Sequence, residues 1–241
     1  MIDQINAWLS QNQIFTPTTL LHYWDGLVLT VQLVFLSLAI GLVISVPLSI
    51  ARTSRNPFIY GPIWFYTYIF RGTPLLVQLY IIYYGVAQIE MLKGTFLWEE
   101  VFRTAFYPAL IAFTLNTVAY TTEIFRGAIQ ATPYGEIEAA KAYGMSWWQR
   151  IRRIVLPSAA RRALPAYSNE VIFMLHASAI ASVVTLVDLT GAARDIYSRF
   201  YAPFWAFSFV ALIYLCLTFT IVFSFRKLEK RMMAHLEPVK N

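Results

Sequence analysis

Long apolar stretches separated by short polar segments run through the chain. Five of these stretches reach or exceed the roughly 20 residues that a helix needs to cross the hydrocarbon core of a bilayer. They fall at about residues 25–51, 58–88, 105–125, 159–186 and 203–225. The pattern predicts an all-α integral membrane protein, with five transmembrane helices that belong to one domain over residues 1–241.

The second apolar stretch is too long for one straight crossing. The sequence Arg71-Gly72-Thr73-Pro74 interrupts it, with apolar and aromatic residues on either side. A residue before proline is biased away from helical geometry. We therefore expect an interfacial or kinked segment there, which leads into the second span.

Composition agrees with a membrane protein. The chain is 58% hydrophobic and 13% charged, with a mean hydropathy of +0.55, whereas soluble domains carry about 25% charged residues. The single cysteine, Cys216, lies in an apolar run, which excludes a disulfide framework and a cysteine metal site. The first nineteen residues contain no Lys or Arg and no long apolar run. We expect a polar leading segment there rather than a cleavable signal peptide.

Basic residues are distributed unevenly over the segments between the predicted spans. If the N-terminus lies outside, fourteen basic residues fall on cytoplasmic segments and four on outer segments. Cytoplasmic loops carry an excess of Lys and Arg, so we expect a periplasmic N-terminus and a cytoplasmic C-terminus. The net charge of +6 has the same explanation, and we expect contact with membrane lipid and not with nucleic acid.

The segment 132–157, between the third and fourth spans, is predicted to hold two short helices. For the first helix, Thr132 offers an N-cap and Pro133 the first helical position. Glu136 then lies in the first turn, where the helix dipole favours negative charge. Gly144 can adopt the left-handed conformation that ends a helix.

The second short helix has its own start signal. Ser146 and Gln149 have the spacing of a capping box, and we expect Leu156-Pro157 to close the helix. One side of it is apolar and carries Trp147, while its arginines lie largely elsewhere. Such a helix is suited to lie along a membrane surface.

This segment also carries a resemblance to a known family. Glu138-Ala139-Ala140, Gly144 and Ile154-Val155-Leu156-Pro157 resemble the cytoplasmic coupling loop of permease subunits of bacterial ABC importers. The resemblance implies the type I importer permease fold and a loop that docks into the ATP-hydrolysing subunit. The residues that we expect to make this coupling contact are Glu136, Glu138, Ala139, Ala140, Gly144 and Arg150.

Polar residues inside the predicted spans are the candidates for substrate contact, because charged side chains at membrane depth are costly and functional by default. Asn169 and Glu170 lie in the fourth span, the least hydrophobic of the five. Asn116, Tyr120 and Glu123 share one face of the third span, because their spacings are four and three. We expect a polar cavity open to substrate from outside, lined by Glu170, Asn169, Asn116 and Tyr120. An uncompensated carboxylate there favours a cationic group, such as an arginine, lysine or ornithine side chain.

Other roles are open for several of these residues. Glu170 and Arg71 could neutralise each other, or pair with a neighbouring subunit for assembly. Glu123 is a further candidate substrate contact, but its place near the cytoplasmic end also suits a gate or a salt bridge. His176 shares a face with Asn169, although a lone membrane histidine is more often a packed, hydrogen-bonded residue. We expect no metal site.

Three further motifs narrow the resemblance to the polar amino-acid uptake branch of these permeases. They are the runs Phe70–Gln78, Asn116–Gly127 and Pro165–Glu170. With Met174-Leu175-His176, the chain is similar to the M-type permeases of importers for histidine, lysine, arginine and ornithine, or for octopine. Many members of the wider branch have a lysine where His176 stands here.

The resemblance implies a set of partners in a bacterial inner membrane. They are a dimer of ATP-binding subunits, a second permease (a Q-type sibling or another copy of this chain), a periplasmic substrate-binding protein and an amino-acid substrate. The chain has no glycine-rich phosphate loop ending in Lys-Ser or Lys-Thr, so ATP must bind elsewhere. We therefore expect no cofactor in this chain, with ATP and Mg²⁺ in the partner, and no enzymatic activity of its own.

Two rival classes of function remain at this stage. One is a secondary transporter or channel that uses Glu123 and Glu170 as a proton or cation relay, although such transporters often show internal repeats that this sequence lacks. The other is a membrane enzyme, but no span carries a pair of metal ligands or a nucleophile with an evident base.

Overall fold

The computed structural model describes residues 14–233. Within that range every regular element is helical, which confirms the prediction of an all-α protein. Most of the predicted polar leading segment (residues 1–13) and the end of the charged tail (residues 234–241) lie outside the described residues.

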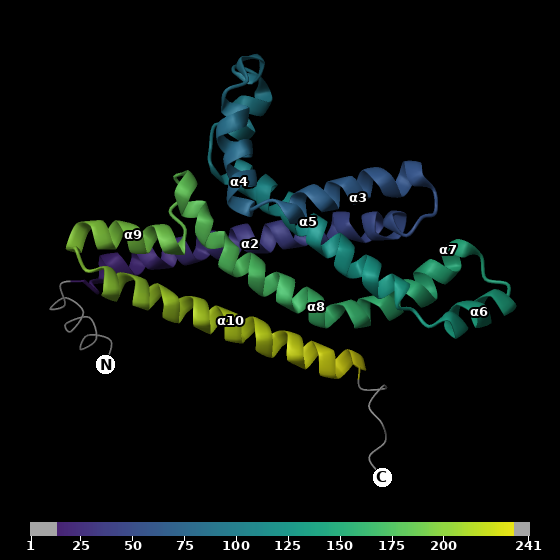
Figure 1. Cartoon of the computed structure of the whole chain (residues 1–241). Coiled ribbons are helices and arrows are strands. Elements are labelled where there is room, and N and C mark those ends of the chain that lie inside the picture. The colour runs from purple at the N-terminus through teal and green to yellow at the C-terminus, as the bar shows by residue number, and fades with distance from the viewer. Residues whose placement is uncertain (1–13, 234–241) are drawn as a thin grey trace, which may run out of the picture. The chain divides into compact units, whose positions relative to one another are not determined.

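Long helices alternate with short helical segments along the described chain (Figure 1). The long elements are α2 (Pro17–Arg52), α3 (Pro57–Gly72), α5 (Phe106–Gln130), α8 (Leu156–Ala177) and α10 (Pro203–Met233). The short α-helices are α4 (Leu75–Tyr80), α6 (Tyr134–Ala142), α7 (Trp147–Arg150) and α9 (Leu189–Phe200). The π-helical and 3₁₀ segments are η1 (Ile81–Gly85), η2 (Glu90–Leu92), η3 (Trp98–Phe102), η4 (Ile151–Val155) and η5 (Ser178–Val184).

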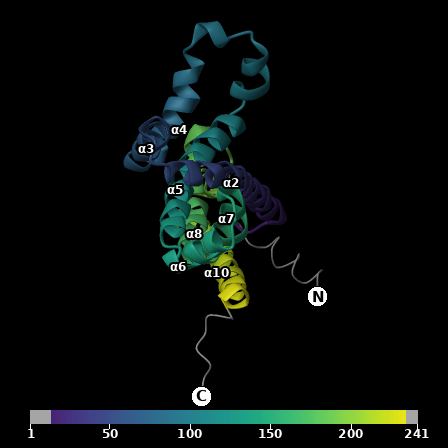
Figure 2. The ribbon, with the colours of Figure 1, turned by 90° about the vertical axis from the view of Figure 1, so that its right-hand side faces the viewer.

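Three helical stretches among the described residues are both long and apolar enough to cross a membrane. They are Pro17–Arg52, Trp147–Val184 and Pro203–Met233, and Leu75–Gly85 is a shorter apolar helix. The second predicted span is interrupted as expected, because α3 ends at Gly72 and Thr73 is extended (φ −119°, ψ 145°). From there the chain passes through α4 and η1, and then through η2 and η3 to α5 (Figure 2).

The described chain forms two compact units, and α2, α5, α8 and α10 contribute residues to both. The first unit holds 14–38, 75–113 and 173–219. Its core joins α2, α9 and α10: the buried Tyr23 packs with Leu189 and Ala206, and its hydroxyl donates to the carbonyl oxygen of Ala206 at 3.1 Å. The prediction of one permease domain over the whole chain stays a prediction.

The second unit holds 39–74, 114–172 and 220–233. Its buried core is shared by α5, η4 and α8, where Phe125 and Ile129 pack with Val155 and Ala159. The ring of Tyr167 on α8 lies 6.3 Å from the ring of Phe225 on α10, along which α8 runs (Figure 1). All the predicted substrate-contacting and coupling residues belong to this second unit.

Two local predictions for the segment 132–157 are wrong. The residue at the start of α6 is Pro133, with no side-chain cap, rather than Thr132. Leu156-Pro157 does not close the second short helix, because the chain continues from α7 through η4 directly into α8. Pro157 therefore lies inside one continuous helical stretch, Trp147–Val184. It has no N–H to donate to the preceding turn, and the irregular hydrogen bonding of the π-helical segment η4 lies directly before it.

Candidate functional site

The carboxylate of Glu170 is buried in the middle of the α8 helix. Its exposed fraction is 6%, and Oε1 accepts a hydrogen bond from the hydroxyl of Thr117 on α5 at 2.9 Å. Among the described residues no Lys, Arg or His lies within ion-pair distance of it. The direct neutralisation of Glu170 by Arg71 that the sequence left open is therefore not observed.

Asn116 and Tyr120, on α5, both contact the C-terminal end of α3. The side-chain nitrogen of Asn116 donates to the carbonyl oxygen of Phe70 at 3.3 Å, and the hydroxyl of Tyr120 donates to that of Arg71 at 3.3 Å. The guanidinium of Arg71 lies 5.4 Å from the centre of the Tyr120 ring. These contacts satisfy carbonyl groups that a helix end leaves without intrahelical partners, and they hold the break between α3 and α4 against α5.

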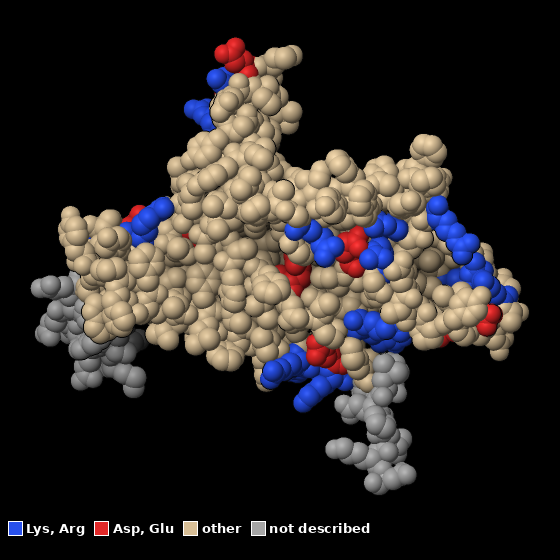
Figure 3. Space-filling view, in the orientation of Figure 1, with Lys and Arg blue, Asp and Glu red and all other residues tan. Residues whose placement is uncertain are grey.

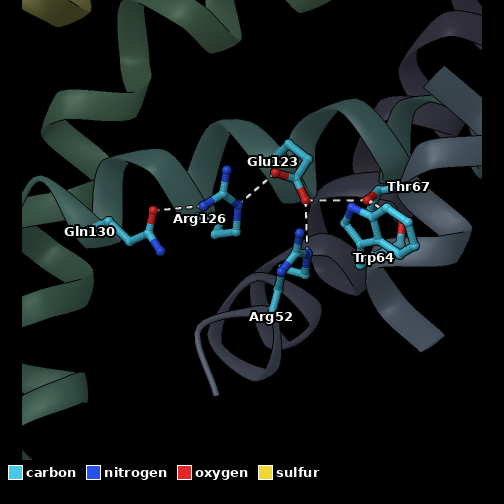
Figure 4. A network of polar contacts seen from close by, with 6 residues as sticks. All are labelled: Arg52, Trp64, Thr67, Glu123, Arg126 and Gln130. Carbon is cyan, nitrogen blue, oxygen red and sulfur yellow. Dashed lines mark hydrogen bonds and ion pairs between the residues drawn. The ribbon is translucent and has the colours of Figure 1, made fainter. Parts of the chain in front are cut away.

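Glu123 is the centre of a network of polar contacts (Figure 4). Oε1 accepts hydrogen bonds from Arg52 on α2 at 3.1 Å and from Thr67 on α3 at 3.2 Å. Oε2 accepts one from Arg126 at 2.6 Å, and Arg126 also donates to Gln130. Both oxygens of Glu123 are thus engaged by this chain, which favours a salt bridge that joins three helices over a direct substrate contact.

Two other polar residues of the fourth span lie apart from this network. Asn169 is exposed, on a different side of α8 from the buried Glu170. His176 lies in the first unit, where its Nε2 is 3.0 Å from the hydroxyl oxygen of Thr218. His176 is thus hydrogen-bonded, as expected, but it is exposed rather than packed. Asn169 is available to a substrate or to a neighbouring subunit.

The segment from α6 to η4 forms a short elbow, which we define as residues 134–155. Gly144 follows the end of α6, the first arm of the elbow, and adopts the left-handed conformation (φ +72°). Ser146 and Gln149 form the predicted capping box at the start of α7, the second arm. These two predictions are confirmed. Arg150 donates to the carbonyl oxygen of Met145 at 2.8 Å, which fixes the turn between the arms.

The elbow exposes polar side chains together with the large aromatic side chains of Tyr134, Tyr143, Trp147 and Trp148. Glu136, Glu138 and Ala139 are exposed on α6, whereas Ala140 is buried. The hydroxyl of Ser158 on α8 donates to Glu136 at 3.2 Å, so the first arm is tied to the helix that carries Glu170. Lys and Arg side chains gather around α6, α7 and the C-terminal part of α10 (Figure 3).

The contacts that sequence reasoning missed come from neutral or distant residues. Thr117 was not singled out as the partner of Glu170. Thr67 and Arg52 were not singled out as partners of Glu123, which they precede by 56 and 71 positions in the sequence. Only the i, i+3 spacing of Glu123 and Arg126 was visible as a local signal. Within residues 14–233 no group of three or more His, Cys, Asp or Glu side chains is placed to hold a metal ion.

The chain was compared with families of known proteins. A family model described as "Binding-protein-dependent transport system inner membrane component" matches residues 37–234. The chain belongs to this family. The match includes α3, the elbow and α8, so the site and the elbow both lie in the part of this permease that its family shares.

Individual relatives agree with the family. The histidine/lysine/arginine/ornithine transport system permease protein HisM of Escherichia coli (strain K12) is 50% identical over 217 residues, 90% of this permease and 91% of HisM. The nopaline transport system permease protein NocM of Agrobacterium fabrum (strain C58 / ATCC 33970) is 47% identical over 193 residues, 80% of each chain. A solved structure described as "Crystal structure of an amino acid ABC transporter with histidines" has a TM-score of 0.77 at 35% identity, covering 87% of this permease and 94% of that chain.

Proposed function

We propose that this permease is one transmembrane subunit of an ATP-driven importer for basic amino acids in a bacterial inner membrane. The observation that carries the proposal is Glu170, a buried carboxylate in a membrane-spanning helix with a threonine hydroxyl as its hydrogen-bond partner and no cation at ion-pair distance among the described residues. A buried charge without a partner is costly. A lysine, arginine or ornithine side chain supplies the missing cation.

The relatives support this choice of substrate class. HisM is described as a permease of a histidine/lysine/arginine/ornithine transport system, and NocM as a permease of a nopaline transport system. We propose that Asn116 and Tyr120 complete the site around Glu170 by fixing the break after α3. Asn169, exposed on another side of α8, contacts a substrate that extends beyond Glu170. Glu123, held by Arg52 and Arg126, then acts as an inner salt bridge rather than as a substrate ligand.

The proposed mechanism is alternating access with a separate motor. A periplasmic binding protein delivers the amino acid to the outer mouth formed by this permease and a second one, a Q-type sibling or another copy. Two ATPase subunits, which bind ATP and Mg²⁺, close and pull on the elbow. Because Ser158 ties Glu136 of the elbow to α8, motion of the elbow is passed to the helix that carries Glu170. The N-terminus is periplasmic and the C-terminus cytoplasmic.

The substrate site is tested with Glu170→Gln in the assembled complex. The variant keeps the shape of the side chain but removes its charge, so transport of arginine or lysine should fall about 10- to 100-fold, the loss of a charge-assisted hydrogen bond. Glu99→Gln, in the exposed pair with Arg103, is the control and should transport normally. Unchanged transport in Glu170→Gln would place the cation site elsewhere, and loss of the complex would assign Glu170 to assembly.

Coupling between ATP hydrolysis and transport is tested with substitutions at two glycines that share a left-handed backbone conformation. Gly144 and Gly94 both have positive φ (72° and 82°) and open space around them, so aspartate strains the backbone equally at either position. Gly144→Asp should uncouple ATP hydrolysis from transport because it distorts the elbow, whereas Gly94→Asp should leave coupling intact. Failure of Gly144→Asp to insert into the membrane would indicate a folding role instead.

The rival function, a relay of protons or cations, is tested by asking whether this chain transports alone or only together with an ATPase subunit. Both carboxylate oxygens of Glu123 are occupied by two arginines, so they are not open to a passing proton or cation. Co-purification of this permease with a nucleotide-binding subunit, and ATP-dependent transport, support the proposal. Substrate flux through vesicles that contain this chain alone would support the relay.

A further inference from the structure

A positively charged cavity lies beside the end of α3 in the second unit. Its volume is about 390 Å³, within the range of small-molecule sites. It is lined by Arg52, Trp64, Thr67, Tyr68, Arg71, Gly72, Glu123 and Arg126. Three guanidinium groups and one carboxylate therefore face the same space.

The single carboxylate neutralises only part of this charge. Glu123 accepts hydrogen bonds from Arg52 and Arg126, so those two side chains have an anionic partner. Arg71 forms no ion pair with any Asp or Glu of the described chain. Its contact is with the face of the Tyr120 ring, 5.4 Å away. A ring face attracts a cation more weakly than a carboxylate does, so Arg71 is left with capacity for an anion.

Arg71 and Glu170 are both held by the same face of α5, although the two do not pair. Thr117 donates to Glu170, and Tyr120, three residues further along the helix, contacts Arg71. The unit thus presents a cation and an anion near each other, each without a direct partner of opposite charge among the described residues. Two groups that could have neutralised each other are kept apart. Arg71 is tethered through its carbonyl oxygen to Tyr120, and Glu170 through Oε1 to Thr117.

We propose that Arg71 binds the α-carboxylate of the transported amino acid while Glu170 binds its cationic side chain. This inference rests on the proposed function and adds the second pole of the same site. A basic amino acid carries both charges at opposite ends, so the two residues fix its direction, with the α-carboxylate at the cavity beside α3 and the side chain toward α8. Arg71 then selects for amino acids over the corresponding amines, a choice that Glu170 alone does not make.

The experiment measures binding to the purified permease–ATPase complex without the binding protein, which would otherwise impose its own selectivity. The probes are arginine and its decarboxylated counterpart agmatine, and lysine and cadaverine. In the unaltered complex the amino acid should bind about 10- to 100-fold more tightly than its amine, the range expected for one charge-assisted hydrogen-bond pair. In Arg71→Gln the affinity for arginine should fall to that for agmatine, while the affinity for agmatine stays the same.

Two further variants separate a carboxylate site from a structural role. Arg71→Lys keeps the charge without the planar fork and should restore part of the preference for arginine. Arg55→Gln, an exposed arginine in the turn before α3, removes the same charge elsewhere and should change nothing.

Three results would overturn the inference. Equal weakening of arginine and agmatine in Arg71→Gln would show a structural role, and an unchanged preference would place the carboxylate on another residue. Loss of the complex in Arg71→Gln would mean that Arg71 pairs with a carboxylate of a neighbouring subunit. The proposed function fails separately, if Glu170→Gln leaves the binding of arginine and of agmatine unchanged.

Discussion

Glu123→Gln is the substitution that tests most directly whether the observed network holds three helices of the second unit together. The carboxylate joins Arg52 of α2, Thr67 of α3 and Arg126 of its own helix α5 (Figure 4). Glutamine has nearly the same shape, so the change removes the negative charge and little else. It leaves two guanidinium groups facing each other with no carboxylate between them.

The expected loss of stability in Glu123→Gln follows from the low solvent exposure of the network. The side chains of Arg52 and Glu123 are 16% and 11% exposed, and that of Arg126 is 27% exposed. Removing one partner of a buried ion pair destabilises a protein by about 3–5 kcal/mol, because the remaining charge stays buried. Partial exposure lowers the expected value for Glu123→Gln to about 3 kcal/mol. In a chain of this size that corresponds to a fall in Tm of about 6–12 °C.

The assay is thermal unfolding of the purified complex in detergent, followed by the loss of its monodisperse peak in size-exclusion chromatography. Glu99→Gln is the matched control, because Glu99 pairs with Arg103 at 2.6 Å on an exposed helical turn. Exposed ion pairs contribute about 0–1 kcal/mol, so the Tm of this variant should change by no more than about 4 °C. A double variant with Arg52→Gln should lose less than the sum of the two single variants.

The reasoning would be refuted if Glu123→Gln and Glu99→Gln shifted Tm by the same small amount. It would also be refuted by strict additivity of Glu123→Gln and Arg52→Gln, since residues in one network are coupled. High salt offers a further check, because screening weakens exposed pairs more than buried ones.

Two other predictions concern the first unit, where α2 meets the start of α9. Gly26→Ala should lower the free energy of unfolding by about 1–3 kcal/mol, because the added methyl group would lie 2.8 Å from the backbone carbonyl oxygen of Asp188. The resulting fall in Tm should be absent in the control Gly61→Ala, which has open space around the added methyl group. Burial raises the pKa of Asp188 from 3.8 to about 6 against the opposing backbone hydrogen bonds of Gly191 and Thr190. The folded state therefore binds this proton more tightly than the unfolded state does, and stability rises as pH falls through about 6. The difference in Tm between the unaltered protein and Asp188→Asn, measured from about pH 8 to about pH 5, should follow that rise; a constant difference would contradict it.

Hydrophobic length predicted where the helices lie but not where they end. The third span was expected over residues 105–125, whereas α5 continues to Gln130, and the fifth was expected over 203–225, whereas α10 continues to Met233. An apolar run marks the part of a helix that lies in lipid. The helix itself can continue into water as long as backbone hydrogen bonding is maintained, and hydropathy does not register that continuation.

Local chemistry was predictable where a few neighbouring residues decide the backbone. The positive φ of Gly144, the capping box of Ser146 and the break before Pro74 all follow from contacts within about four residues. Leu156-Pro157 was misread because its effect depends on η4, the π-helical segment before it. A change of helical register of that kind has no simple sequence signal.

The partners of the buried charges could not be predicted, because they come from other helices. Polarity at membrane depth drew attention to Glu170 and Glu123, both of which take part in contacts between helices. Which neutral or basic side chain reaches each of them depends on how α2, α3, α5 and α8 pack. Thr117 offers no charge or spacing that would have marked it as the partner of Glu170.

The central claim is that an elbow on the cytoplasmic side receives force from a separate ATPase. The most direct measurement is disulfide or short-linker crosslinking from a cysteine placed at Tyr143, which is 86% exposed next to Gly144, in a chain whose Cys216 is replaced by alanine. In the assembled complex this cysteine should crosslink to the nucleotide-binding subunit, with a yield that changes when ATP is added. Labelling of the same cysteine in intact cells by a reagent that cannot cross the inner membrane, with no crosslink to that subunit, would contradict the account.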